Sequence, residues 1–341
     1  MKCIMIYSSQ TGNTEMIARA IHAGVKQTAY QCEIVKIKDV NPNQLHQFDL
    51  IGIGSSVIGM VETLNVQSFI KSMHFVGGKH VFAFATHGCR GEYFAHSIAT
   101  KLKRRGMIFI GERDWYANAY LGGGFEYFPT AGHPDEIDLK EAAEFGKEMA
   151  ELSLRIYAGD TKLIPPLPKS RQPVLKEFLR QRQEKLAKIM VQRRPEQDRF
   201  GQSGVPAGKI RRPPMFSYQK DKCLFPKCRL CMENCPMYGI DLTVEPPVIA
   251  KPCMGCGFCR LICPSGALDN PMMASGKRDE NMDNPAFQQD WDDFHLVPLA
   301  KAEAEGKFRR HVPMEKLGWE YRVAPRPDKH PKWIIGKGVQ R

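Results

Sequence analysis

The first half of the chain alternates short apolar runs with amphipathic stretches. Apolar runs of strand length occupy residues 3–7, 32–37, 50–54, 81–85 and 107–110. Between them, apolar residues recur at helical spacing near residues 16–21, 63–72, 92–105 and 136–157. Strands that alternate with helices predict an α/β fold with a doubly wound, parallel, five-stranded sheet over residues 1–158. Because ligands of such sheets bind beyond the carboxyl ends of the strands, the loops there are the candidates for chemistry.

The pattern changes after residue 158, where prolines and basic residues accumulate. The chain has a formal net charge of +12, and residues 160–222 hold 16 Lys and Arg against 6 Asp and Glu. We interpret residues 159–217 as a connector with one amphipathic helix, which Ser170 caps and whose apolar side includes Phe178. That helix packs on its own protein or on another subunit, and the sequence leaves both open. Because no nucleic-acid-binding module accompanies the basic residues, nucleic acid is not a predicted partner.

Eight of the eleven cysteines form two matched runs, and each run ends in Cys-Pro. The second run has the spacing C-x-x-C-x-x-C-x-x-x-C-P, by which bacterial ferredoxins hold [4Fe-4S] clusters, with the fourth cysteine on the other cluster. Residues 218–270 therefore read as a small α+β, ferredoxin-like domain with two clusters. The predicted ligands are Cys223, Cys228, Cys231 and Cys263 for one cluster, and Cys253, Cys256, Cys259 and Cys235 for the other. Structural zinc is the alternative, but it needs two well-separated C-x-x-C pairs.

A hydroxyl-rich loop follows the first apolar run. Its hydroxyls, together with N–H groups at the start of the next helix, can surround a phosphate without a cation, and Gly12 permits the tight turn. A hydroxyl-rich helix cap is the alternative. The loop resembles the phosphate loop of flavodoxins, which implies FMN as the cofactor. The predicted phosphate-binding residues are Ser9, Gln10, Thr11, Gly12, Asn13 and Thr14.

Two further loops lie where flavodoxins hold the isoalloxazine ring. The candidates in them are Ser55, Ser56, Val57, Ile58 and Gly59 after the third strand, and Thr86, His87, Gly88 and Cys89 after the fourth. Unlike small flavodoxins, neither loop contains Trp or Tyr, so an aromatic face would come from Tyr93, Trp115, Tyr120 or Phe125. His87 and Cys89 either shape the loop and form hydrogen bonds or take part in catalysis. We assign no catalytic residue. Residues 131–139 resemble the entry to the last flavodoxin helix, whose start Asp135 and Asp138 would cap.

Residues 271–341 form a C-terminal tail. One periodic stretch is expected at residues 297–307, and aromatic residues are spaced through the tail at Trp291, Phe294, Trp319, Tyr321 and Trp333. Spaced aromatic residues supply contact energy at a modest entropic cost. We therefore predict that the tail wraps its own protein or docks on a partner.

The order of the two motifs matches the flavodoxin-ferredoxin fusion proteins of anaerobic bacteria and archaea. That resemblance implies electron transfer between FMN and two [4Fe-4S] clusters, as a subunit of or donor to a larger redox enzyme contacted through the basic connector and the tail. The alternative is a self-contained oxidoreductase that reduces a small substrate at FMN. A third interpretation makes the clusters structural in a regulatory or assembly protein. The sequence fixes neither the donor, the acceptor nor the oligomeric state, so a homo-oligomer stays open.

The remaining bulk properties bear on location. Hydrophobic residues make up 43% of the chain, yet no apolar stretch approaches the roughly 20 residues of a membrane helix, so direct membrane insertion is not expected. The start, MKCIMIYSS, lacks the features of a secretory signal. We therefore expect a cytoplasmic protein in a reducing, anaerobic setting.

Overall fold

The structure is a computed structural model of the 341-residue chain. It describes residues 1–29, 31–119, 129–170, 217–249, 251–254, 256–269 and 284–317, and the short pieces 177–178, 180–182 and 184–185. Most of the predicted connector helix, the tail aromatics beyond residue 317, and the candidates Tyr120 and Phe125 therefore lie outside the described residues.

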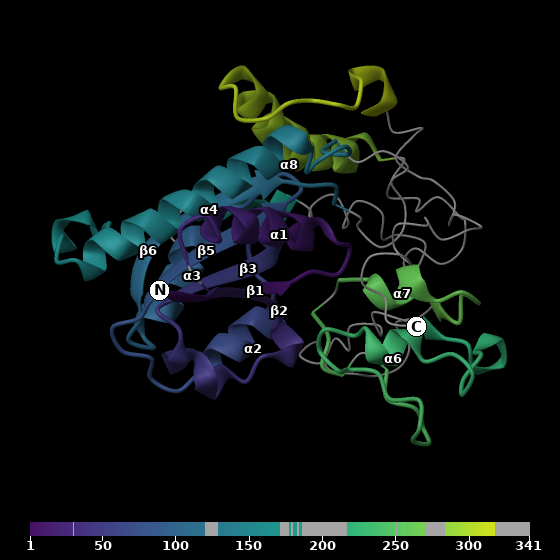
Figure 1. Ribbon diagram of the computed structural model, residues 1–341. Coiled ribbons are helices and arrows are strands. Elements are labelled where there is room, and N and C mark those ends of the chain that lie inside the picture. Colours follow the sequence, from purple (N-terminus) through teal and green to yellow (C-terminus); the bar gives the residue numbers. More distant parts are fainter. Residues whose placement is uncertain are drawn as a thin grey trace.

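A parallel sheet forms the centre of the N-terminal part (Figure 1). Its strands are β1 (Lys2–Ser8), β2 (Gln31–Lys36), β3 (Leu50–Ile58), β5 (His80–His87) and β6 (Ile108–Tyr116). They lie in the order β2-β1-β3-β5-β6, and every neighbouring pair is parallel. A two-residue strand, β4 (Val61–Glu62), pairs antiparallel with the end of β3. The predicted doubly wound parallel sheet is confirmed for this part of the chain.

Four helices cover the two faces of the sheet. Helices α1 (Asn13–Val25) and α4 (Glu136–Tyr157) pack on one face, and α2 (Leu64–Ser72) and α3 (Phe94–Lys103) pack on the other. Helices α1 and α4 touch closely because Gly24 and Gly146 lie at their crossing, where a Cβ would collide with backbone atoms of the other helix. The predicted cap of α4 is confirmed: Asp135 accepts hydrogen bonds from the N–H groups of Ile137 and Asp138.

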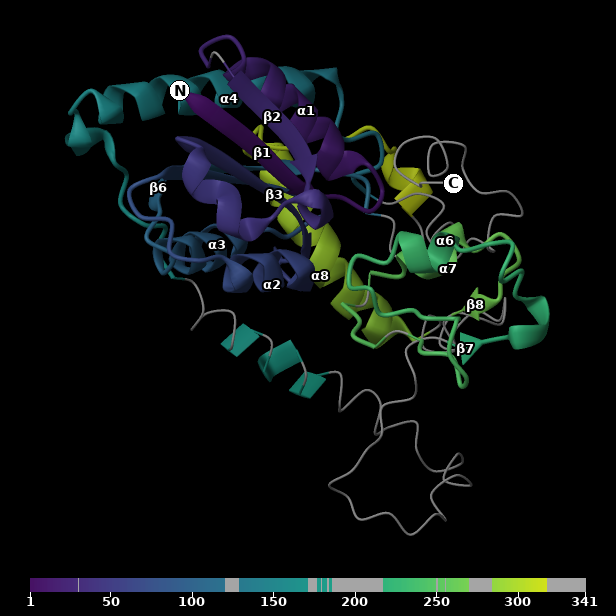
Figure 2. The same ribbon diagram turned by 60° about the horizontal axis from the view of Figure 1, so that its bottom comes forward.

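The cysteine-rich part is a separate small unit beyond the carboxyl ends of β1 and β2 (Figures 1 and 2). Strands β7 (Ser217–Tyr218) and β8 (Leu268–Asp269) pair antiparallel and bring its two ends together. Two short helices, α6 (Leu230–Glu233) and α7 (Phe258–Ile262), carry cysteines of the first and second run. Because Ile240, Leu242 and Leu268 are the main apolar residues buried with them, the cysteines form much of this unit's core.

The tail contains a longer helix than the sequence pattern predicts. Helix α8 spans Pro285–Ala304, whereas the periodic stretch was expected only from residue 297. Asn284 caps α8, and Pro285 occupies its first turn, where a missing N–H costs nothing. The first half of α8 carries aromatic and acidic residues that contact other elements rather than a periodic apolar face, which is why periodicity missed it. Among the described residues, no helix has the length and apolar character needed to cross a membrane.

Candidate functional site

The predicted phosphate loop joins β1 to α1 with a turn that requires glycine. Gly12 has a φ of +93° and precedes the first residue of α1, and its N–H donates to Ser9 Oγ at 3.2 Å. No side chain caps α1. The N–H groups of its first turn are therefore not satisfied by a capping side chain, which is the arrangement that binds a phosphate.

Hydrogen bonds hold this loop against the neighbouring strands. Ser56 Oγ donates to Gln10 Oε1 at 2.9 Å, and Asn13 Nδ2 donates to the carbonyl of Asn118 at 2.8 Å. The Thr14 hydroxyl lies 2.8 Å from that of Thr86, and both residues are buried. The structure thus brings together five predicted cofactor residues, and it adds Asn118, which was not predicted.

The loop after the third strand is shorter than predicted. Strand β3 continues through Val57 to Ile58, so the turn to β4 consists of Gly59 and Met60, with φ of +64° and +70°. Ser55 is buried and its hydroxyl accepts the N–H of Thr63 at 3.1 Å. Val57 and Ile58 are half-buried at the carboxyl edge of the sheet, where a flat ring can rest on them.

The loop after β5 contains a buried histidine with an unused nitrogen. His87 is 7% exposed, and its Nε2 lies 3.6 Å from Asp114 Oδ2. Its Nδ1 is buried and has no hydrogen-bond partner among the described residues. A buried polar atom without a partner costs free energy, so this nitrogen is suited to a bound group. Asp114 was not predicted from sequence, although it lies at the same edge of the sheet on β6.

Cys89 and Arg90 of the same loop face the C-terminal segment. Cys89 packs against the cluster of Leu299, Ala302 and Phe308, and burial raises the pKa of its thiol to about 12. The thiol is therefore protonated at neutral pH and is not a nucleophile. Arg90 Nε donates to the carbonyl of Phe294 at 3.0 Å, and its guanidinium lies over the Phe294 ring at 4.8 Å.

Of the aromatic candidates for ring stacking, the described ones belong to the interior. Trp115 is 3% exposed and meets the Phe145 ring edge-on at 5.8 Å. Tyr93 is also buried, at the start of α3. Nothing in their placement assigns either of them to a flavin.

The eight cysteines of the two runs line two small cavities, four in each. One cavity is lined by the first cysteine group, Cys223, Cys228, Cys231 and Cys263, and the other by the second cysteine group, Cys235, Cys253, Cys256 and Cys259. All eight are free thiols. Each cavity takes three cysteines from one run and the last cysteine of the other, which is the grouping the spacing predicts. The ligation of iron itself stays a prediction.

The chemistry of these thiols fits a cationic centre. Burial, followed by repulsion from neighbouring thiolates, raises the pKa of Cys231 to about 12. Burial likewise raises the pKa of Cys256 to about 11, with Cys253 and Cys235 adding to it. Four crowded thiolates are costly by themselves, and bound iron removes that cost because it supplies the opposite charge. The N–H of Gly239 already donates to Cys235 Sγ at 3.3 Å, as in the outer shell of a metal centre.

A larger cavity, of about 500 Å³, lies between the phosphate loop and the second cysteine group. Ser9 and Gln10 line it from the side of the parallel sheet, and Cys235 and Phe258 line it from the cysteine-rich side. Lys36, at the carboxyl end of β2, also lines it. Lys36 was not a predicted site residue: ligands bind near strand ends, but the position of the cysteine-rich part beside the end of β2 was not predicted.

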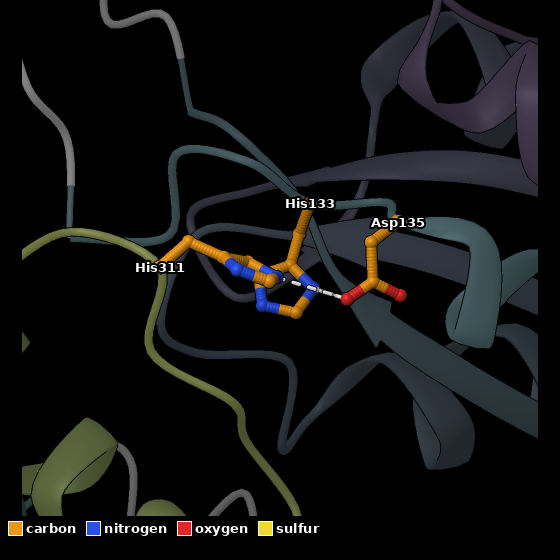
Figure 3. Close-up of side chains that lie close together, drawn as sticks. All are labelled: His133, Asp135 and His311. Carbon is orange, nitrogen blue, oxygen red and sulfur yellow. Dashed lines mark hydrogen bonds and ion pairs between the residues drawn. The ribbon is translucent and has the colours of Figure 1, made fainter.

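A cluster of titratable side chains attaches the C-terminal segment near α4 (Figure 3). His133 Nδ1 contacts Asp138 Oδ2 at 2.6 Å, and its Nε2 contacts the carbonyl of Arg309 at 2.5 Å. Both partners only accept, so both ring nitrogens donate and His133 is charged. His311 Nε2 lies 2.9 Å from Asp135 Oδ2, and the Arg309 guanidinium pairs with Asp135 and Asp138. Although His133, Asp135 and His311 are near enough to hold a metal, these contacts already occupy their ligand atoms.

Comparisons with known proteins bear on both parts of the chain. A family model described as "Flavodoxin domain" matches residues 4–116. The flavodoxin of Clostridium beijerinckii is 24% identical over 151 residues, 43% of this chain and 99% of that protein. An uncharacterised ferredoxin of Methanocaldococcus jannaschii is 38% identical over 48 residues, 14% of this chain and 77% of that protein.

Among solved structures, a flavodoxin from the domain Archaea covers 45% of this chain and 99% of its own, with 25% identity and a TM-score of 0.37. The family model and the strand order agree on residues 4–116, and the hydroxyl-rich loop lies within them. The N-terminal part of this chain therefore carries a flavodoxin-like domain.

Proposed function

We propose that this chain is an electron-transfer protein that holds FMN in its flavodoxin-like domain and two [4Fe-4S] clusters in its cysteine-rich part. When bound, these groups would supply one- and two-electron redox chemistry. The observation that carries the proposal is the grouping of the eight cysteines into two sets of four, each drawn from both runs.

The residues for FMN support the same function. The N–H groups at the start of α1, the turn at Gly12 and the hydroxyl of Ser9 would hold the phosphate. Val57 and Ile58 would lie against the ring, and the unpartnered Nδ1 of His87 is available for a hydrogen bond. Each of these features is placed at the carboxyl edge of the sheet.

The large cavity supports electron exchange between the two parts. Gln10 of the phosphate loop and Cys235 of the second cysteine group line the same space, so the two sites are neighbours within one chain. No residue of the first cysteine group is among the described residues that line it. We infer that the second group is the cluster nearer to the flavin.

The contacts of the loop after β5 make a self-contained substrate reductase the weaker proposal. Its candidate groups are His87, Cys89 and Arg90 of the loop after β5, but the Cys89 thiol is protonated and packed, and Arg90 is bound to Phe294. We further propose, from the resemblance alone, an anaerobic setting and a larger redox partner.

The test is a measurement of cofactor content and reduction. Protein purified without oxygen is assayed for FMN, iron and acid-labile sulfide, and is then titrated with dithionite under spectroscopic observation. The proposal expects one FMN and about eight iron and eight sulfide per chain, all reducible. Zinc without labile sulfide, or cluster signals in a protein that binds no flavin, would refute it.

A further inference from the structure

We propose that the cavity between the phosphate loop and Cys235 is a second small-molecule site, which binds a planar aromatic anion in addition to FMN. Its volume of about 500 Å³ falls within the range of sites for cofactors and small ligands. It lies at the junction of two structural units, where such sites are common.

Among the described residues, the cavity shares only Ser9 and Gln10 with the predicted FMN site. Of the phosphate loop, only residues up to Gln10 line it, and no described residue of 54–60 or 86–91 does so. The hydrogen bonds of Gln10 to Ser56, and of Asn65 to the Ser8 hydroxyl at 2.8 Å, join the loop to β3 and α2 on the side of the cavity. FMN with its ring on residues 54–60 and 86–91 would therefore leave the remainder of this space open.

The walls favour a flat apolar ring. Phe69 and Phe258 are 8% and 5% exposed and line the cavity from opposite structural units. Tyr238 lines it too, but its side chain is 67% exposed, so a large part of the ring has no protein against it. Tyr238 also has a φ of +51°, a conformation that is rare for a bulky residue. An aromatic ligand stacked on Tyr238 would bury this surface.

The charge at the cavity favours an anion. Lys36 and Lys38 line it, and no described residue forms an ion pair with Lys36. The acidic residue among the described lining residues is Glu233, whose carboxylate lies 3.5 Å from Arg229. The balance of charge at the opening is therefore positive, which attracts a negatively charged group on the ligand.

The position of Cys235 at the cavity narrows the class of ligand. Cys235 lines the cavity, and the proposed function assigns it to a cluster, so this part of the inference rests on that function. Flavin nucleotides and anthraquinone sulfonates are planar, conjugated molecules that exchange electrons and carry acidic groups. We therefore expect a ligand of this class.

The experiment uses anthraquinone-2,6-disulfonate as the probe, added to the anaerobic, full-length holoprotein. Calorimetry should find one probe molecule bound per chain, while the FMN content stays constant. Lys36→Gln should weaken binding about three- to tenfold, since it removes one partly screened charge contact. Tyr238→Asn should weaken binding about fivefold, because it removes the ring and asparagine tolerates the positive φ.

Matched variants separate this site from binding elsewhere. Lys26→Gln removes an exposed lysine outside the cavity, and Phe75→Ala removes an aromatic side chain that is 76% exposed outside it. Both should bind the probe as the parent does. Equal losses in Lys26→Gln and Lys36→Gln would overturn the proposal, as would release of one FMN per bound probe. Absence of binding to protein with full FMN and iron would also overturn it, while leaving the proposed function intact.

Discussion

At Gly12 the backbone takes a φ of +93°, and a Cβ built there meets no atom within 4 Å. Space is therefore available for a side chain, and the conformation alone demands glycine. The same combination occurs at Gly159, with a φ of +109° and open surroundings, just after α4. Gly12 lies in the proposed phosphate site and Gly159 does not. Substitutions at the two positions can therefore distinguish an effect of backbone strain from an effect on ligand binding.

We expect Gly12→Ala and Gly159→Ala each to lower the free energy of unfolding by about 1 kcal/mol, because alanine disfavours the left-handed region. Only Gly12→Ala should also weaken FMN binding, by about tenfold, since it reorients N–H groups that would bind the phosphate. Urea unfolding of the flavin-free protein and fluorescence titration with FMN measure the two effects. Equal FMN affinity in both variants would remove the phosphate loop from the site.

A second residue, His133, makes the attachment of the tail depend on pH. Burial would lower its pKa, but hydrogen bonds to Asp138 and to the Arg309 carbonyl outweigh burial and raise it. The pKa of Asp135 is lowered: burial opposes this, but the N–H of Asp138 and the side chains of Arg309 and His311 outweigh it. A raised histidine pKa stabilises the attached state at pH values below the ordinary histidine pKa of about 6.5. A lowered aspartate pKa stabilises it at pH values above the ordinary aspartate pKa of about 3.9.

Attachment of residues 309–311 should therefore be strongest between about pH 4 and 6.5. It should weaken as pH rises through the raised pKa of His133, and as pH falls through the lowered pKa of Asp135. Hydrogen exchange at these residues, corrected for its intrinsic pH dependence, measures the attachment. His133→Gln should abolish the weakening of the attachment as pH rises, whereas the control His46→Gln should retain it. A pH-independent parent would contradict the role of His133.

At the scale of the element, α8 attaches the tail to the flavodoxin-like domain and to the connector. Leu299 is fully buried with Phe308 against Cys89 and Tyr116. Closer to its start, Asp290 pairs with Arg182 of the connector at 2.9 Å, and Phe294 packs with Arg90. The helix thus packs on the loop after β5, and the partly buried Cys89 lies against it.

We expect Leu299→Ala to cost about 2–5 kcal/mol in the stability of this packing, because it leaves a cavity in a buried cluster. Cys89 should then become reactive. The rate of its alkylation in the holoprotein, followed by mass spectrometry of the peptide, measures this exposure. Val297→Ala, at a residue that is 60% exposed on the same helix, is the control and should leave the rate unchanged. A similar rate in all three proteins would show that α8 does not protect the thiol.

The elements also show which parts of the fold the sequence can predict. The strands were predictable because β1, β3 and β5 are buried on both faces and appear as continuous apolar runs. The first half of α8 was not, because contacts such as Asp290 with Arg182 hold it and leave no periodic signature. The turn at Gly59 and Met60 was also missed, since β4 has only two residues and its pairing with β3 is a tertiary feature.

At the scale of the whole molecule, the arrangement brings one cysteine group to the flavodoxin-like domain. The spacing of the cysteines predicted the two sets, because the runs have the ferredoxin pattern in which the fourth cysteine of each run belongs to the other set. The neighbourhood of Gln10 and Cys235 could not be predicted, because no local pattern records which surfaces of two units meet. Lys36 was missed for the same reason: it becomes a site residue only when the cysteine-rich part lies over the end of β2.

This arrangement makes the two cysteine groups unequal, and paired substitutions test that inequality. Cys256→Ser and Cys228→Ser should each reduce iron from about eight to about four per chain and leave FMN bound, because the altered cysteines lie outside the flavodoxin-like domain. Among the described residues, only the second group borders the cavity beside the phosphate loop, so only Cys256→Ser should remove the proposed cluster nearer to the flavin. After selective photoreduction of the flavin, the remaining cluster should accept an electron quickly in Cys228→Ser and slowly in Cys256→Ser. Rapid-freeze electron paramagnetic resonance measures both rates.

Equal rates would mean that the flavin does not communicate through the second group, and loss of FMN in either variant would contradict the independence of the two parts.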